Sequence, residues 1–280
     1  MSLNQLTIVG VGLIGASLGL AARRLGLARR VVGLGRNLSS LQQAESLGAI
    51  DRSCLDGADA VADADLVVVC TPVDQIANQV LELAAHCNPG TLFTDAGSTK
   101  SLIVKAIEEG LPAQARFIGG HPLAGSEKKG PQHADAKLFQ NRWVVLTPTP
   151  RTHPDALAQV RAFWESLGSH VRIMAPEAHD ETLALTSHLP HLAASALAGL
   201  LPASAFDLAA TGFRDTTRVA AGDPALWSAI FQHNRAALLA SLGQMEQRLA
   251  DFRLALEMSD WNRIQDLLAQ GKKVRDALGS

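Results

Sequence analysis

Short apolar runs alternate with stretches of helical periodicity in the first part of the chain. The runs are nearly continuous in apolar residues, as in QLTIVG and DLVVVC, which is typical of parallel strands covered on both faces. The pattern predicts an α/β fold with a doubly wound sheet. The expected strands lie at residues 5–10, 29–35, 65–70, 91–97, 116–120, 142–148 and 170–176. The expected helices lie at residues 15–25, 38–47, 73–86, 99–109 and 154–167.

The strand signal stops after Pro176, and the rest of the chain is rich in Ala and Leu at helical spacing. We therefore expect a sheet domain over residues 1–175 and an all-helical domain over residues 176–280. Two domains also fit the length of 280 residues, at about 150 residues per domain. Stretches such as HLAASALAGLLPASA carry small residues that allow close helix packing, within one subunit or across a dimer interface.

Composition and charge narrow the class of protein. Hydrophobic residues make up 47% of the chain and charged residues 19%, so a sizeable core can form. A net charge of −2 offers no basic surplus for phosphates, which argues against nucleic acid as a partner. No run of about 20 apolar residues occurs, so no membrane span is expected. The three cysteines show no metal-ligand spacing, and without a signal peptide they indicate the cytoplasm.

The stretch GVGLIG follows the first expected strand and opens the first expected helix, as a dinucleotide-binding turn of a Rossmann-type fold requires. We assign Gly10 to the tight turn, Gly12 to close approach of a pyrophosphate and Gly15 to helix–strand packing. The N-terminus of the helix would add N–H donors for the phosphates. The other cofactor contacts that we expect near this turn are Leu13, Ile14, Thr71 and Pro72.

The end of the second expected strand lacks the acidic residue that would bond a ribose 2′-OH and repel a 2′-phosphate. Gly35 stands there, followed by Arg36, whose guanidinium can offer a fork of donors to a phosphate. Asn37, Ser39 and Ser40 can add neutral donors. This predicts NADP as the cofactor, with NAD as the alternative if Arg36 only stacks on the adenine.

Two polar stretches follow expected strands, where ligands bind in open α/β sheets. In DAGSTK (residues 95–100), either Ser98 and Thr99 cap the next helix or Ser98 takes part in catalysis. In GGHPLAGSEKKG (residues 119–130), His121 lies in a glycine-rich loop where core packing does not explain a histidine. We therefore expect His121 to be functional.

Two further polar stretches lie in the helical part. In TSHLPHLAAS (residues 186–195), His188 and His191 lie close to one face of a helix, but no third ligand at companion spacing supports a metal. In GFRDTTRVAAGDP (residues 212–224), two arginines and an aspartate form either a surface ion network or a site for a substrate carboxylate.

Taken in order, GVGLIGASL, DAGSTK, GGHPLAGSE, SHLPH and FRDTTRVAAGDPALW closely resemble the prephenate/arogenate (cyclohexadienyl) dehydrogenase family of tyrosine biosynthesis. The resemblance extends from Leu6 to about Ala236. It implies a nucleotide-binding domain followed by a helical domain that forms a homodimer. It also implies NAD(P)-dependent oxidative decarboxylation of a small molecule, prephenate or arogenate, by hydride transfer from ring C4.

The resemblance also implies roles for individual side chains. His121 would accept a hydrogen bond from the C4 hydroxyl and act as base, with Ser98 beside it. The ordinary pKa of a histidine side chain then predicts a loss of activity below about pH 6.5. The substrate-binding residues implied are Arg218 for the ring carboxylate, His191 for the side-chain end, Ser187, and a charge network of Glu127 and Asp215.

Two alternatives remain open from the residues alone. A two-domain dehydrogenase of the β-hydroxyacid or pyrroline-carboxylate reductase kind would call for a catalytic lysine or a different loop in place of GGHPLAGSE. A dinucleotide-sensing protein without turnover would need the glycine turn but not the four polar stretches together. The choice between prephenate and arogenate also stays open.

Overall fold

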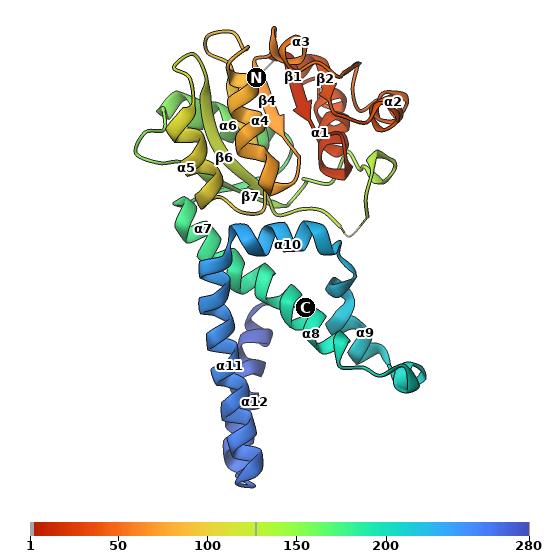
Figure 1. Ribbon diagram of the computed structural model, residues 1–280, viewed down its shortest axis with the longest axis vertical. Helices are drawn as coiled ribbons and strands as arrows, with labels where there is room; N and C mark the ends of the chain where they lie inside the picture. Colours follow the sequence, from red (N-terminus) through yellow and green to blue (C-terminus); the bar gives the residue numbers. More distant parts are fainter. Residues whose placement is uncertain (1–2, 127, 280) are drawn as a thin grey trace. The chain divides into compact units, whose positions relative to one another are not determined.

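The computed structural model describes residues 3–126 and 128–279 (Figure 1). By its internal contacts the chain divides into two compact units, of which the first ends at Asn234 and the second begins at Arg235. The predicted domain boundary at residue 175 follows the change from strands to helices instead, and it stays a prediction.

A sheet of eight strands forms the centre of the first unit, in the order β3-β2-β1-β4-β5-β6-β7-β8. All neighbouring strands are parallel except β6 and β7, which run antiparallel. The predicted Rossmann-type doubly wound sheet is therefore confirmed, with one reversed strand. The strands are β1 (Leu3–Val9), β2 (Ala28–Leu34), β3 (Arg52–Cys54), β4 (Leu66–Val69), β5 (Leu92–Asp95), β6 (Arg116–Pro122), β7 (Trp143–Thr147) and β8 (His170–Ile173).

Helices cover both faces of this sheet. Along β4, Leu66 and Val68 belong to the apolar core that includes α1 and α6, whereas Val67 and Val69 belong to the core that includes α4 and α5. Because successive strand residues point to opposite faces and both faces are buried, the strands read as continuous apolar runs. The helices are α1 (Leu13–Arg24), α2 (Leu38–Ser46), α4 (Val73–Ala84), α5 (Ser101–Gly110) and α6 (Pro154–Ser166).

The sheet differs from the expected elements at two places. β3 and the short helix α3 (Gly57–Val61) are missing from the prediction, because β3 is a three-residue strand at the sheet edge without an apolar run. The reversed direction of β7 follows from its connection to β6. In its described part that connection carries a 3₁₀ turn (Pro131–His133) and no α-helix, whereas a crossover between parallel neighbours usually contains one.

The chain after β8 is helical. One continuous helical stretch runs through α7 (Pro176–Leu183), a π-helical turn (Ala184–His188) and α8 (Leu189–Gly199). Ile230 of α10 joins the core of α4 and α5, which is why these helices stay in the first compact unit. The elements that follow α8 in this unit are a 3₁₀ turn (Ala203–Leu208), α9 (Thr211–Thr217), a second 3₁₀ turn (Arg218–Ala221) and α10 (Pro224–His233).

The second compact unit consists of α11 (Arg235–Glu257) and α12 (Trp261–Ala277). Asp260 caps α12 by accepting a hydrogen bond from the backbone N–H of Arg263 at 2.9 Å. Within residues 3–126 and 128–279, no helix is long and apolar enough to cross a membrane.

Candidate active site

The glycine turn between β1 and α1 has the geometry of a dinucleotide-binding turn. Gly10 has a φ of +88°, which residues other than glycine rarely adopt. A Cβ at Gly15 would lie 2.1 Å from the carbonyl oxygen of Gly10, so only glycine lets α1 start this close to β1. Nothing lies within 4 Å of the Cβ position of Gly12, which leaves its backbone open to a ligand. The turn therefore fits the pyrophosphate of a dinucleotide.

A cavity of about 470 Å³ lies beside this turn. Of the predicted cofactor residues, six line it: Gly10, Gly12, Arg36, Asn37, Thr71 and Pro72. The lining does not include Leu13, Ile14, Gly15 and Ser39, for which cofactor contact stays a prediction. Ser40, which the sequence analysis named beside Ser39, does line the cavity. Gln75 and Gln79 of α4 also line it, and the sequence analysis missed both.

The end of β2 shows what could recognise the ribose side of the cofactor. The Cβ position of Gly35 lies 3.6 Å from Leu41, an ordinary contact distance, so a side chain would fit there. Arg36 donates from Nη2 to Oε1 of Gln75 at 3.4 Å. The Asn37 side chain caps α2 by accepting from the backbone N–H of Ser40 at 3.2 Å. Arg36 is thus the cation of this cavity wall, and its Gln75 partner is neutral.

Asp95 and Lys100 form a buried ion pair in the DAGSTK stretch. Asp95 also accepts from the backbone N–H groups of Gly97 and Gly120, each at 2.9 Å. Lys100 donates from Nζ to the carbonyl oxygen of Gly120 at 2.8 Å. These contacts tie the end of β5 to β6 directly before His121.

Ser98 lies half-buried in the same stretch. The structure tests whether it caps the next helix. Helix α5 begins at Ser101 and its N-cap residue makes no side-chain capping bond, so Ser98 does not cap it. Instead Asp180 of α7 accepts from the backbone N–H of Lys100 at 2.7 Å and of Ser101 at 2.8 Å. The interpretation of Ser98 as a helix cap is therefore wrong, and a catalytic role of Ser98 stays a proposal.

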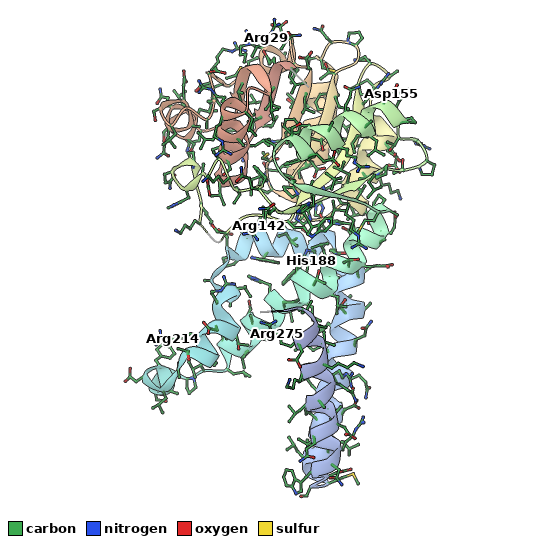
Figure 2. All side chains as sticks on the ribbon, turned by 180° about the vertical axis from the view of Figure 1, so that it is seen from behind. Arg29, Arg142, Asp155, His188, Arg214 and Arg275 are labelled. Atoms are coloured by element: carbon green, nitrogen blue, oxygen red, sulfur yellow. The ribbon has the colours of Figure 1, made fainter. Side chains whose placement is uncertain are left out.

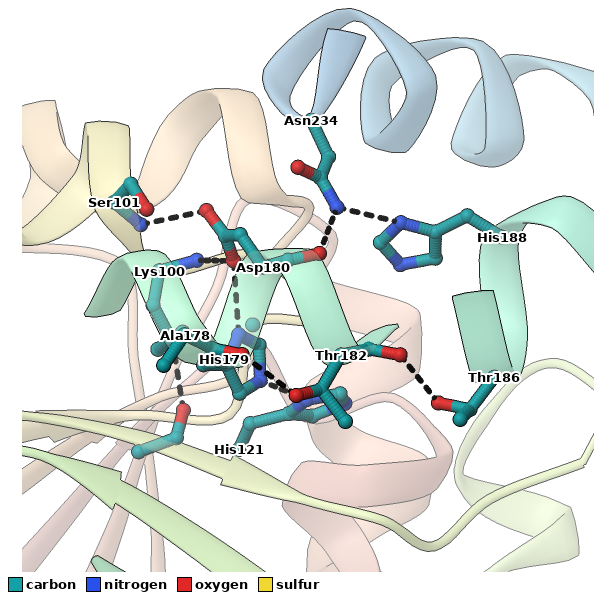
Figure 3. A network of polar contacts seen from close by, with 12 residues as sticks. Lys100, Ser101, His121, Ala178, His179, Asp180, Thr182, Thr186, His188 and Asn234 are labelled. Atoms are coloured by element: carbon teal, nitrogen blue, oxygen red, sulfur yellow. Dashed lines mark hydrogen bonds and ion pairs between the residues drawn. The ribbon is translucent and has the colours of Figure 1, made fainter. Parts of the chain in front are cut away.

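His121 lies near the carboxyl end of β6 and is buried. Its Nδ1 lies 2.8 Å from Nε2 of His179, and Nδ1 of His179 lies 2.8 Å from Oδ1 of Asp180 (Figure 3). Asn234 donates to the carbonyl oxygen of Asp180 at 2.7 Å and lies 3.0 Å from Nδ1 of His188. The sequence analysis missed His179, Asp180 and Asn234, which lie within a helix or at the end of one and form no recognisable motif.

The buried histidines of this network are neutral at pH 7. Burial lowers the pKa of His121 well below its ordinary value of 6.5, and the neighbouring His179, Lys100 and His188 act in the same direction. Burial likewise lowers the pKa of His179, and that of His188 to about 4. The expectation that activity falls below about pH 6.5 is therefore corrected, because desolvation moves the titration of His121 to lower pH.

These shifts make the stability of the protein depend on pH. As pH falls below 6.5, the three imidazoles take up protons more readily in the unfolded chain than in the folded one, so the free energy of unfolding should fall, and for His188 this continues down to about pH 4. The shift of His188 from 6.5 to about 4 alone corresponds to about 3 kcal/mol. Urea unfolding at a series of pH values measures this slope.

The control for this slope compares two histidine variants. His188→Asn keeps an acceptor for Asn234 and should flatten the slope, whereas His86→Asn changes an exposed histidine after α4 and should not. Equal slopes in the two variants would show that His188 is not a buried neutral group.

His191 is buried on α8 and stacks on Trp227 of α10, with ring centroids 3.6 Å apart and an angle of 12° between the planes. A Cβ at Gly222 would lie 2.4 Å from Nε1 of Trp227, so glycine makes room for this stack. Ser187 lies half-buried on the π-helical turn, one turn before His191. Such turns are rare and occur frequently at functional sites.

The remaining substrate residues are less constrained. Arg218 begins the 3₁₀ turn that packs on α8, and its side chain is exposed. Asp215 is exposed on α9 and makes no ion pair in the described part of the chain, while Glu127 lies outside the described residues. Arg214, the other arginine of this stretch and labelled in Figure 2, donates to the carbonyl oxygen of Ala209 at 2.8 Å. The predicted network of Glu127 and Asp215 stays a prediction.

No group of three His, Cys, Asp or Glu side chains within residues 3–126 and 128–279 could hold a metal ion. The glycine turn and His121 both lie at the carboxyl edge of the parallel strands, the edge where open α/β sheets bind ligands. A dinucleotide cavity at the same edge as a buried neutral histidine is the arrangement of a nicotinamide-dependent dehydrogenase.

Comparison with known proteins narrows this class to one family. Residues 18–173 match the family model of the prephenate dehydrogenase nucleotide-binding domain, and residues 175–270 match that of the prephenate dehydrogenase dimerization domain. The chain is 34% identical to a cyclohexadienyl dehydrogenase of Zymomonas mobilis, over 98% of this chain and 96% of that protein. The chain therefore belongs to the prephenate dehydrogenase family, whose members are oxidoreductases.

Two solved structures carry the same fold over nearly the whole chain. A prephenate dehydrogenase from Aquifex aeolicus, in complex with hydroxyphenyl propionate and NAD+, has a TM-score of 0.92 at 30% identity and 99% coverage of both chains. An arogenate dehydrogenase from Synechocystis has a TM-score of 0.83 at 34% identity, over 98% of this chain and 99% of that one. A nicotinamide dinucleotide is the cofactor that this family and fold support.

Proposed function

We propose that this chain catalyses the NAD(P)-dependent oxidative decarboxylation of prephenate, arogenate or both. The observation that carries the proposal is His121, a buried neutral imidazole at the carboxyl edge of the sheet. Its Nδ1 is engaged by His179, so Nε2 is the nitrogen that can meet a substrate hydroxyl. A neutral imidazole is the form that a general base requires.

The reaction needs a base at one atom. The proton of the C4 hydroxyl moves to Nε2 of His121 as the carbon–hydrogen bond at C4 breaks with its electron pair. A nicotinamide dinucleotide held by the glycine turn at Gly10 and Gly12 and by Arg36 would supply the acceptor for that hydride. The bond from C1 to its carboxylate then breaks, and its electron pair enters the ring and gives a phenolate and CO₂. His121 can return its proton to the phenolate oxygen, so no net proton is released.

The other side chains of the site would bind and orient the substrate. Ser98 would lie beside His121, Arg218 would pair with the ring carboxylate, and His191 would contact the side-chain end. Ser187, Asp215 and Glu127 would complete the substrate contacts. Arg218 is exposed on a turn that packs against the helix of His191. This supports its pairing with the ring carboxylate, because an exposed guanidinium can bind a carboxylate with two donors.

The test of this function is a set of initial-rate assays with prephenate and arogenate, each with NAD and with NADP. The rate is followed at the absorbance of the reduced nicotinamide. We expect turnover in at least one combination. Bound dinucleotide with no turnover in any combination would contradict the proposal and favour a dinucleotide-sensing protein.

We further propose that the cofactor is NADP rather than NAD. The cavity wall at the end of β2 carries Arg36 and lacks an acid at Gly35, so no carboxylate at that position repels a 2′-phosphate; the acid in the cavity lining, Glu82, comes from α4. Since the Cβ position of Gly35 is not crowded, the absence of an acid is not imposed by packing.

Gly35→Asp should therefore reverse the cofactor preference. We expect the ratio of kcat/KM for NADP to that for NAD to fall roughly 10- to 100-fold, because a charged hydrogen bond is worth about 1.5–3 kcal/mol. Gly35→Asn, which has the same shape without the charge, is the matched control and should change the ratio much less. Equal effects of the two variants would contradict the electrostatic explanation.

A homodimer is the proposed assembly. Helices α11 and α12 leave apolar side chains more than half exposed at Leu249, Leu254, Leu256, Leu268 and Val274. Exposed apolar surface on this scale marks association sites. Light scattering after size exclusion measures the mass, and a mass of one chain at micromolar concentration would contradict the dimer.

A further inference from the structure

Two buried side chains of α7 have no role in the reaction described above: His179, which contacts His121 at the end of β6, and Asp180, which contacts His179. His179 is fully buried and Asp180 nearly so. Figure 3 shows them in a line with His121, in which His179 lies between the carboxylate and the imidazole of His121. Both contacts in this line are 2.8 Å long. A carboxylate therefore reaches the base through a second histidine.

The hydrogen-bond chemistry of this line fixes the proton positions. Desolvation raises the pKa of Asp180, but hydrogen bonds from His179 and from the backbone of Ser101 and Lys100 outweigh it, so Asp180 is ionised. A carboxylate only accepts, so Nδ1 of His179 carries a proton. The neutral ring of His179 then accepts at Nε2, and Nδ1 of His121 must be its donor. Nε2 of His121 is left with its lone pair.

We propose that His179 and Asp180 are positioning residues that hold His121 in the tautomer with its proton on Nδ1, so that Nε2 acts as the base. The inference rests on the proposed function, because it explains why Nε2 of His121 is the basic nitrogen that the reaction uses. When the hydroxyl proton reaches Nε2, the Nδ1–H of the resulting imidazolium bonds to His179, whose own Nδ1–H bonds to Asp180. The dyad thus stabilises the charge that forms on His121 and needs no further reactant.

Asp180 also joins this line to the rest of the site. Its carboxylate accepts from the backbone N–H groups of Lys100 and Ser101, which end the stretch that carries Ser98. One helix therefore fixes His121 and the Ser98 stretch relative to each other. Among the residues that the structure describes, the charged and titratable groups around His121 are His179 and Asp180 of α7, Asp95 and Lys100 before α5, and His188 of the π-helical turn.

The first experiment compares two replacements of His179. His179→Phe removes the acceptor for His121, and we expect kcat to fall about 100-fold, as for lost proton-transfer catalysis. The acid limb of kcat/KM should move about one to two pH units lower, because the imidazolium loses a charged hydrogen bond. His179→Gln can place an amide oxygen near the former Nε2 and should keep kcat within about tenfold of the wild type.

The second experiment uses a matched pair of acid-to-amide changes on α7. Asp180→Asn introduces an N–H donor opposite His179, which favours the reversed tautomers, and the same type of change costs about 10⁴-fold in a serine protease triad. We expect a loss of about 100-fold or more here. Glu181→Gln changes the exposed neighbour and should leave kcat and its pH profile unchanged.

Ring ¹⁵N shifts of histidine-labelled protein read the tautomer without turnover, and His121→Asn assigns the signal. We expect neutral His121 protonated on Nδ1 in the wild type and in His179→Gln, but redistributed in His179→Phe. An unchanged tautomer and pH profile in His179→Phe, with kcat within twofold, would overturn the inference while the proposed function stands. A wild type without turnover would instead contradict the proposed function, and the ¹⁵N shifts would still decide the tautomer.

Discussion

Replacing His121 with Asn should lower kcat about a thousandfold, in the middle of the 10²–10⁴ range for loss of a general base. Asn has no group that can take the hydroxyl proton, so the carbon–hydrogen bond must break without that assistance. A thousandfold loss corresponds to about 4 kcal/mol in the activation free energy. The Asn side chain can still bond to His179, so we expect no collapse of the site. Steady-state kinetics at saturating substrate measures this effect.

Dinucleotide affinity separates a chemical effect from a structural one. His121 does not line the cofactor cavity, so the Kd for the dinucleotide should stay within about twofold, which is less than 0.5 kcal/mol. His86→Asn, the same change at an exposed histidine after α4, should leave both kcat and Kd unchanged. A His121→Asn enzyme with full kcat and an unchanged acid limb would remove His121 from its proposed role as base.

The sheet and the glycine turn could be predicted from the sequence because their signals are local. GVGLIG carries its three geometric requirements within six residues, and DLVVVC shows its double-sided burial in its own composition. β3 could not be found in this way, since a three-residue edge strand has no run of apolar residues. The reversal of β7 depends on how a long connection runs, which no single window of sequence contains.

The supporting side chains of the site could not be predicted, because their contacts are not local. His121 and His179 are 58 positions apart, and Lys100 and Asp180 are 80 apart. Within α7, His179 and Asp180 read as ordinary polar residues of a helix. The choice between a cap and a catalytic Ser98 likewise depended on Asp180, which supplies the cap from a different helix.

The exposed residues of the stretch 212–224 show a second limit of prediction from sequence. Arg218 and Asp215 lie on surface elements, and their roles depend on what they bind. Neither burial nor a partner within the described chain fixes their side chains, in contrast to His191, which packs on Trp227. For such residues the resemblance to a family carries information that the fold by itself does not supply.

Asp95→Asn should destabilise the protein by about 3–5 kcal/mol, the usual cost of removing one partner of a buried ion pair. Neither side chain of the Asp95–Lys100 pair has exposed surface, so no water can replace the lost carboxylate. At about 2–4 °C per kcal/mol, the melting temperature should fall by roughly 10 °C. Asp63→Asn, the same change in the exposed pair with Arg30, should cost less than about 1 kcal/mol.

The pH dependence of this loss identifies its cause. Without Asp95, the ammonium of Lys100 must stay unpaired or give up its proton, so its pKa falls below the already lowered wild-type value. The unfolded chain then binds a proton that the folded protein lacks, and the stability of Asp95→Asn should rise as pH approaches 10.5. The double variant Asp95→Asn with Lys100→Met should lose this pH dependence and recover part of the stability, because no buried charge remains. If the single and double variants are equally unstable at every pH, the cost comes from the lost bonds to Gly97 and Gly120 and not from the charge of Lys100.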